Sequence, residues 1–124
     1  MPLRFEIDED MGLVRTTAEG VVTAQDLIDH AKALSARRNR PLAELVDFSD
    51  RAEVTVPIEV VREIGTLLRT ADENRPGGRL ALVARSDVVY GMLRVFQAHR
   101  THESVEIRAY RDREEALRWL LEVP

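Results

Sequence analysis

Apolar and polar residues alternate at the start of the chain and recur at helical spacing further on. The alternating apolar positions are Leu3, Phe5 and Ile7. This period predicts a strand with one buried face. A turn at residues 8–12 and a second apolar strand at residues 13–21 complete a predicted β-hairpin.

A helical pattern follows the hairpin. Thr23 is the predicted N-cap, and Asp26 three residues later forms a weak capping box. The stripe expected to be buried consists of Leu27, Ile28, Ala31 and Leu34. Pro41 ends this pattern. The next predicted strand covers residues 42–48, and we expect a Ser-Asp turn and then a loop after it.

The second helix is predicted to begin at Thr55 as N-cap, with Pro57 tolerated in the first turn. Its broad apolar stripe comprises Val60, Val61, Ile64, Leu67, Leu68 and Ala71. A turn at residues 74–78 leads into five consecutive apolar residues, 80–84. Such a run is typical of an interior parallel strand that is covered on both faces.

The last third of the chain contains two helices and one strand. Ser86 is a helix-start signal, and Gly91 in the second turn weakens that helix by about 1 kcal/mol relative to alanine. Residues 105–110 alternate apolar and charged positions, which fits an edge strand. Asp112 and Glu115 form a predicted capping box for the final helix.

These elements predict a single α/β domain over residues 1–124, in the order β-β-α-β-α-β-α-β-α. Right-handed strand–helix–strand crossovers place the last three strands parallel to one another. The initial hairpin makes the expected sheet mixed, with four to five strands and flanking helices.

Composition narrows the function classes. The net charge is −4, and the 18 basic residues, of which only Lys32 is lysine, are scattered among 22 acidic ones. No basic field is therefore present to attract nucleic acid, and the cluster at residues 37–40 is better explained by a helix end. The absence of cysteine excludes disulfides and thiolate chemistry. No signal peptide or membrane span is visible, so we expect a cytoplasmic protein.

Candidate binding residues gather where the parallel strands are predicted to end, since ligands of open α/β sheets usually bind there. The candidates for a small molecule or anion are Asp47, Ser49, Arg85, Ser86 and Tyr90. The neighbouring Asp50 and Asp87 would repel an anion. The alternative is that the hydroxyl and carboxylate side chains only cap helices and close turns.

Catalytic and metal signals are weak. His99 and His102 share a helix face but lie at a helix end without a spaced third ligand, and His30 stands alone. A hydrolytic serine at Ser49 or Ser86 would need one of these histidines within hydrogen-bond reach. The sequence therefore predicts no metal site, no cofactor and no catalytic residues.

The helix that contains Gly91 offers a possible contact between copies of the chain. Its outward face would be formed by Tyr90, Gly91, Leu93, Arg94 and Gln97, with the glycine allowing close backbone approach. The alternative is that the apolar members of this set belong to the core.

Three segments resemble the bacterial SpoIIAA-like proteins of the STAS-like fold: VDFS at residues 46–49, GRLALVARSDVVYGMLRVFQ at 78–97 and VEIRAYRDREEALRWL at 105–120. The resemblance implies a mixed sheet with flanking helices and a class of mostly uncharacterised or regulatory and interaction domains. We therefore expect an unknown protein partner, and the face around Gly91 adds a homodimer as one form of such contact. Related anti-sigma-factor antagonists carry a phosphoacceptor serine about where this chain has Val56, beside Thr55. The fold also resembles lipid-binding Sec14-type domains, but 124 residues with 5% aromatics leave little room for a large apolar cavity.

The interpretation favoured by the sequence is therefore a non-enzymatic interaction domain of the STAS-like class without the usual phosphoacceptor serine. The alternative is a small-molecule or anion-binding module at the carboxyl edge of the strands.

Overall fold

The chain folds into alternating strands and helices after an initial hairpin. The computed structural model describes residues 2–37, 40–72, 77–100 and 105–122, the side chains of Ser35, Ser49 and residues 69–72 excepted. The elements are β1 (Leu3–Asp8), β2 (Leu13–Val22), α1 (Ala24–Ser35), β3 (Ala43–Val54), α2 (Ile58–Asp72), β4 (Gly78–Ala84), α3 (Asp87–Arg100), β5 (Val105–Tyr110) and α4 (Arg113–Leu120). The predicted order of elements is confirmed.

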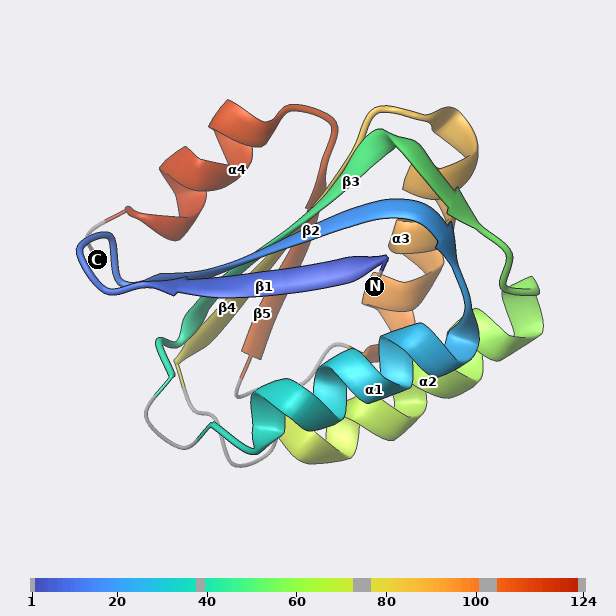
Figure 1. Ribbon diagram of the computed structural model, residues 1–124, viewed down its shortest axis with the longest axis horizontal. Helices are drawn as coiled ribbons and strands as arrows, with labels where there is room; N and C mark the ends of the chain where they lie inside the picture. The colour runs from blue at the N-terminus through green and yellow to red at the C-terminus, as the bar shows by residue number, and fades with distance from the viewer. Residues whose placement is uncertain (1, 38–39, 73–76, 101–104, 123–124) are drawn as a thin grey trace.

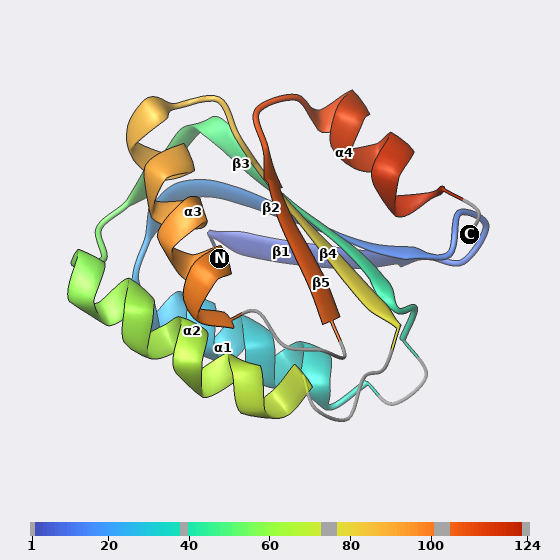
Figure 2. The same ribbon diagram turned by 180° about the vertical axis from the view of Figure 1, so that it is seen from behind.

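Five strands form one mixed sheet in the order β1-β2-β3-β4-β5. β1 is antiparallel to β2, and every other neighbouring pair is parallel. Helices α1, α2 and α3 lie on one side of this sheet and α4 lies on the other, as the two opposite views show (Figures 1 and 2). The predicted class, a mixed α/β sheet with flanking helices, is confirmed.

β3 is longer than predicted, and the prediction of a loop after residue 48 is wrong. The strand continues to Val54 because residues 52–54 pair with β2, with Gly20 opposite Ala52. The register shifts between Ala18 and Gly20, and Gly20 adopts a φ of 77° that L-residues rarely use. The polar residues of this stretch did not signal a strand because they lie at the solvent-exposed end of the sheet.

Three helix starts follow the predicted chemistry. Thr23 and Asp26 form the full reciprocal capping box at α1. The Ser86 hydroxyl accepts the backbone N–H of Val89 at 3.4 Å. Asp112 caps α4 by accepting the backbone N–H of Glu114, in place of the predicted capping box with Glu115. These local signals need only neighbouring residues, which is why the sequence reveals them.

Thr55 is not the N-cap that the sequence predicted. Its backbone N–H and its hydroxyl both donate to the carbonyl of Val22, at 3.1 and 3.4 Å. The first turn of α2 is instead closed by the carbonyl of Pro57, which accepts the N–H of Val61 at 3.0 Å. Thr55 therefore ties the end of β3 to β2.

The core has two layers because β4 is apolar on both faces. Leu80 and Leu82 face α3, while Ala81 and Val83 face Trp119 of α4. α2 packs mainly against α3 and also against α1. It therefore closes the outside of the three-helix layer and leaves space between that layer and the strands.

Candidate functional site

The predicted binding residues at the carboxyl edge of the strands do not converge in one crevice. Asp47 alternates with Val46 along β3 and so projects to the α4 side of the sheet, where its carboxylate lies 3.8 Å from Nε of Arg113. Tyr90 lies in α3 on the other side, and Ser86 immediately precedes that helix. The side chain of Ser49 lies outside the described residues. The sheet therefore separates residues that the sequence places at one edge.

Carboxylates already accompany the arginines of this edge. Arg85 lies 3.8 Å from Asp50. Arg111 pairs with Asp87, donates to the carbonyl of Arg85 at 2.6 Å and stacks over the ring of Tyr90 at 5.0 Å. An anion would have to displace these exposed pairs, each of which stabilises the fold by about 1 kcal/mol or less. The geometry favours a solvated array of ion pairs over an anion site.

Sequence reasoning missed Arg111 at this edge. The available signal was its position, the first residue after β5, because the carboxyl ends of parallel strands lie at one edge of a sheet.

The face predicted for contact between copies is only partly on the surface. Leu93 is buried in the core, and Nε2 of Gln97 donates to the carbonyl of Ile107 at 2.8 Å. Gly91 and Arg94 are exposed. A Cβ added at Gly91 would meet no described atom within 4 Å. The described residues thus give no packing reason for this glycine, and the homodimer stays a prediction.

His99 does not complete a catalytic set with Ser86. His99 and Ser86 lie at opposite ends of α3, about 20 Å apart along the axis at roughly 1.5 Å per residue. Nδ1 of His99 lies 3.0 Å from the carbonyl of Val95, and His102 lies outside the described residues. Within the described chain, no three His, Asp or Glu side chains gather to hold a metal ion.

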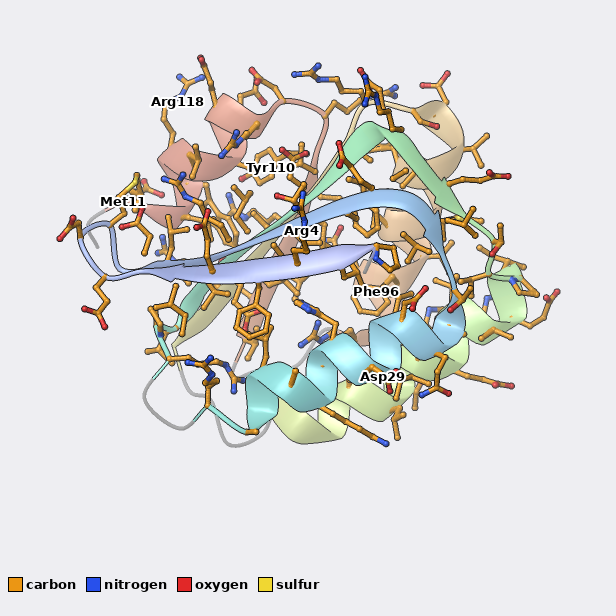
Figure 3. All side chains as sticks on the ribbon, viewed as in Figure 1. Arg4, Met11, Asp29, Phe96, Tyr110 and Arg118 are labelled. Atoms are coloured by element: carbon orange, nitrogen blue, oxygen red, sulfur yellow. The ribbon has the colours of Figure 1, made fainter. Side chains whose placement is uncertain are left out.

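A cavity lies between the strands and the layer of α1, α2 and α3. Its volume is about 110 Å³. Most of its lining is aliphatic or aromatic, with Leu27 from α1, Val61, Ile64 and Leu68 from α2, Val89, Met92, Leu93 and Phe96 from α3, and Leu3, Val46, Phe48, Val54, Leu80 and Leu82 from the strands. Figure 3 shows Phe96 between the sheet and the helices, where its ring borders this space.

One end of the cavity is polar. The residues that line this end are His30, Arg40, Glu44 and Arg100. Glu44 is the second residue of β3 and Arg100 is the last of α3, so this end lies at the amino ends of the parallel strands. The sequence had predicted the binding residues at the opposite edge, where the carboxyl ends of the parallel strands lie.

Ion-pair and hydrogen-bond contacts hold the side chains at the polar end of the cavity. Nε of Arg40 lies 3.6 Å from Oε1 of Glu44, which is only 5% exposed, and Nη1 of Arg40 donates to the carbonyl of Leu34 at 2.6 Å. Nε2 of His30 lies 3.3 Å from Oγ1 of Thr16, a buried residue of β2. Two polar residues at inward strand positions, Thr16 and Glu44, were the signal that could have indicated this site.

Burial lowers the pKa of His30, an effect that Arg100 reinforces and Glu44 opposes. The imidazole is therefore neutral near pH 7, with one nitrogen that donates and one that accepts.

Comparisons with known proteins assign no family: no protein-family model matches the chain, and no curated protein matches it. None of the helices in the described segments is long and apolar enough to cross a bilayer.

Proposed function

We propose that this chain is a non-catalytic binding domain whose ligand is a small, largely apolar molecule held between the sheet and α1, α2 and α3. The observation that carries this proposal is the cavity of about 110 Å³. Protein interiors are close-packed, and apolar space between packed layers lowers the free energy of unfolding in proportion to its volume. A ligand that fills it would recover much of that energy.

The volume limits the ligand. Apolar cavities of about 150 Å³ accept benzene or xenon, whereas ordinary ligand pockets span about 300–1,000 Å³. A lipid chain does not fit into 110 Å³, in keeping with the limited room that the composition suggests. The ligand class is therefore a molecule close to benzene in size.

Benzene itself is the direct probe. Titration of the isotope-labelled protein, followed by amide NMR, should shift resonances of residues that line the cavity. Benzene at about 100 times its dissociation constant should raise the free energy of unfolding by about 2.7 kcal/mol.

Two variants of one cavity residue serve as matched controls. Val46 lines the cavity from β3 and is buried. Val46→Phe should fill the space and abolish benzene binding while the fold persists, and Val46→Ala should enlarge the space and retain binding. If neither the wild-type protein nor Val46→Ala responds to benzene, the proposed function is wrong.

A second candidate is the protein-contact role that the resemblance to SpoIIAA-like proteins implies, here as a homodimer. The observation that favours it is Gly91, an exposed glycine inside α3 with open space around it. Since this glycine weakens the helix and no described atom packs against it, close approach of a second copy would explain it. Val56 is a buried valine at the place of the family's phosphoacceptor, so the proposal includes no phosphorylation switch there.

Light scattering of the wild-type protein and Gly91→Arg tests this second role. The Cβ of the new side chain would meet no described atom within 4 Å, and a long arginine there would block a close contact between copies. Loss of a dimer in the variant supports the role, whereas a wild-type monomer or an unchanged dimer contradicts it.

A further inference from the structure

His30 brings an imidazole ring to the lining of the cavity. It comes from α1 and lines the cavity near Glu44 and Arg100. Its ring is held from two sides, by Oγ1 of Thr16 at 3.3 Å from Nε2 and by the ring of Phe5, whose centroid lies 5.8 Å away in an edge-on arrangement. The imidazole is thus positioned before any ligand arrives.

The second ring nitrogen of His30, Nδ1, can still make a hydrogen bond. Nδ1 makes no hydrogen bond within the part of the chain that the structure describes. Whichever tautomer the Thr16 contact selects, Nδ1 then offers either one donor or one acceptor to a partner. A hydroxyl group can donate and accept, so it matches both cases.

The charged residues at this end make a poor receptor for a charged ligand. The guanidinium of Arg40 already contacts both the Glu44 carboxylate and the carbonyl of Leu34. Charges of both signs line the cavity within the same small volume. A ligand carboxylate would meet Glu44 and a ligand ammonium would meet the arginines, and either would lose its hydration. A neutral polar group avoids both penalties.

We infer that the ligand is a small alcohol or phenol whose apolar body fills the cavity and whose single hydroxyl group hydrogen-bonds to Nδ1 of His30. This inference rests on the proposed function and adds the chemical class of the ligand. The hydroxyl would lie at the amino ends of the parallel strands, beside the half-buried side chains of His30 and Arg100.

Three probes of similar size separate the possibilities: toluene, phenol and benzoate. We expect phenol to bind the wild-type protein at least as tightly as toluene, and benzoate to bind most weakly. In His30→Phe the hydroxyl loses its partner, so phenol affinity should fall by about fivefold or more while toluene affinity changes by less than about twofold. Amide NMR titration measures all three and also shows that the variant is folded.

Two further variants keep the test decisive. His30→Leu replaces His30→Phe should the larger ring unfold the protein or fill the cavity. Val46→Ala alters the apolar part of the cavity without touching His30, so it should change toluene and phenol affinities by a similar factor.

The outcomes separate the two proposals. If toluene and phenol both fail to bind the wild-type protein, the proposed function fails. If toluene binds but phenol binds far more weakly, or if the His30 variants leave the phenol-to-toluene ratio unchanged, only the hydroxyl assignment is overturned. Tightest binding by benzoate would also overturn it, in favour of an anionic ligand.

Discussion

Two helical glycines form a matched pair that tests the packing around the cavity. Gly65 lies in α2 where this helix crosses α3, and Gly91 lies in α3 on the surface. A Cβ added at Gly65 would be 3.1 Å from Cβ of His99 and 3.2 Å from the carbonyl oxygen of Phe96. Added at Gly91, it would meet nothing described within 4 Å. The same substitution to alanine therefore has opposite expected effects.

The magnitudes follow from helix propensity and packing. Alanine stabilises a helix by about 1 kcal/mol relative to glycine, so Gly91→Ala should raise the free energy of unfolding by about that amount. Gly65→Ala has the same favourable helix propensity, but its Cβ forces α2 away from the α3 backbone. Overpacking of this kind lowers the free energy of unfolding by about 1–3 kcal/mol. Its net effect should range from about zero to about 2 kcal/mol of destabilisation. The two variants should differ by about 1–3 kcal/mol.

Urea unfolding followed by the fluorescence of Trp119 provides the assay. This tryptophan is the single one in the sequence and is 6% exposed, so unfolding transfers it to water. Equal stabilisation by both substitutions would contradict the close crossing of α2 and α3. Because both helices line the cavity, it would also contradict the shape of the cavity wall. Destabilisation by Gly91→Ala that grows with protein concentration would instead indicate a second copy packed against α3.

Further predictions concern pH and the helix caps. Because burial lowers the pKa of His30 below its ordinary 6.5, the unfolded chain takes up a proton that the folded chain resists. The free energy of unfolding should therefore fall as the pH drops below about 6.5, by at most about 1.4 kcal/mol per pH unit for this one group, and His30→Phe should flatten that slope. A wild-type-to-variant difference that is constant from pH 5 to 8 would contradict this. Ser86→Ala should destabilise the protein by about 0.5–1 kcal/mol through loss of the cap to Val89, as measured by urea unfolding. Thr55→Val should lower the free energy of unfolding by less than about 0.5 kcal/mol, because Thr55 caps no helix. A larger decrease than for Ser86→Ala would contradict the conclusion that Thr55 is not an N-cap.

The sequence by itself determined the elements whose signals are local. The hairpin, the apolar run that became β4, and the caps at Thr23 and Ser86 all depend on residues within a few positions of one another. Apolar residues on both faces of β4 also predicted layers on both sides of the sheet. Periodicity and capping chemistry act over one turn or one strand, which is why they can be recognised without the fold.

Only the tertiary structure decided the length of β3 and the position of the candidate site. Residues 49–54 carry no strand pattern, and β3 extends to Val54 because residues 52–54 pair with β2 beyond a bulge at Gly20. The cavity exists because α2 packs chiefly on its neighbouring helices, which leaves the strand face beneath it incompletely filled. The distance between two layers depends on how side chains from several elements interlock, and no single segment encodes it. The packing of α1 over the sheet is therefore what brings together His30, Thr16 and Glu44.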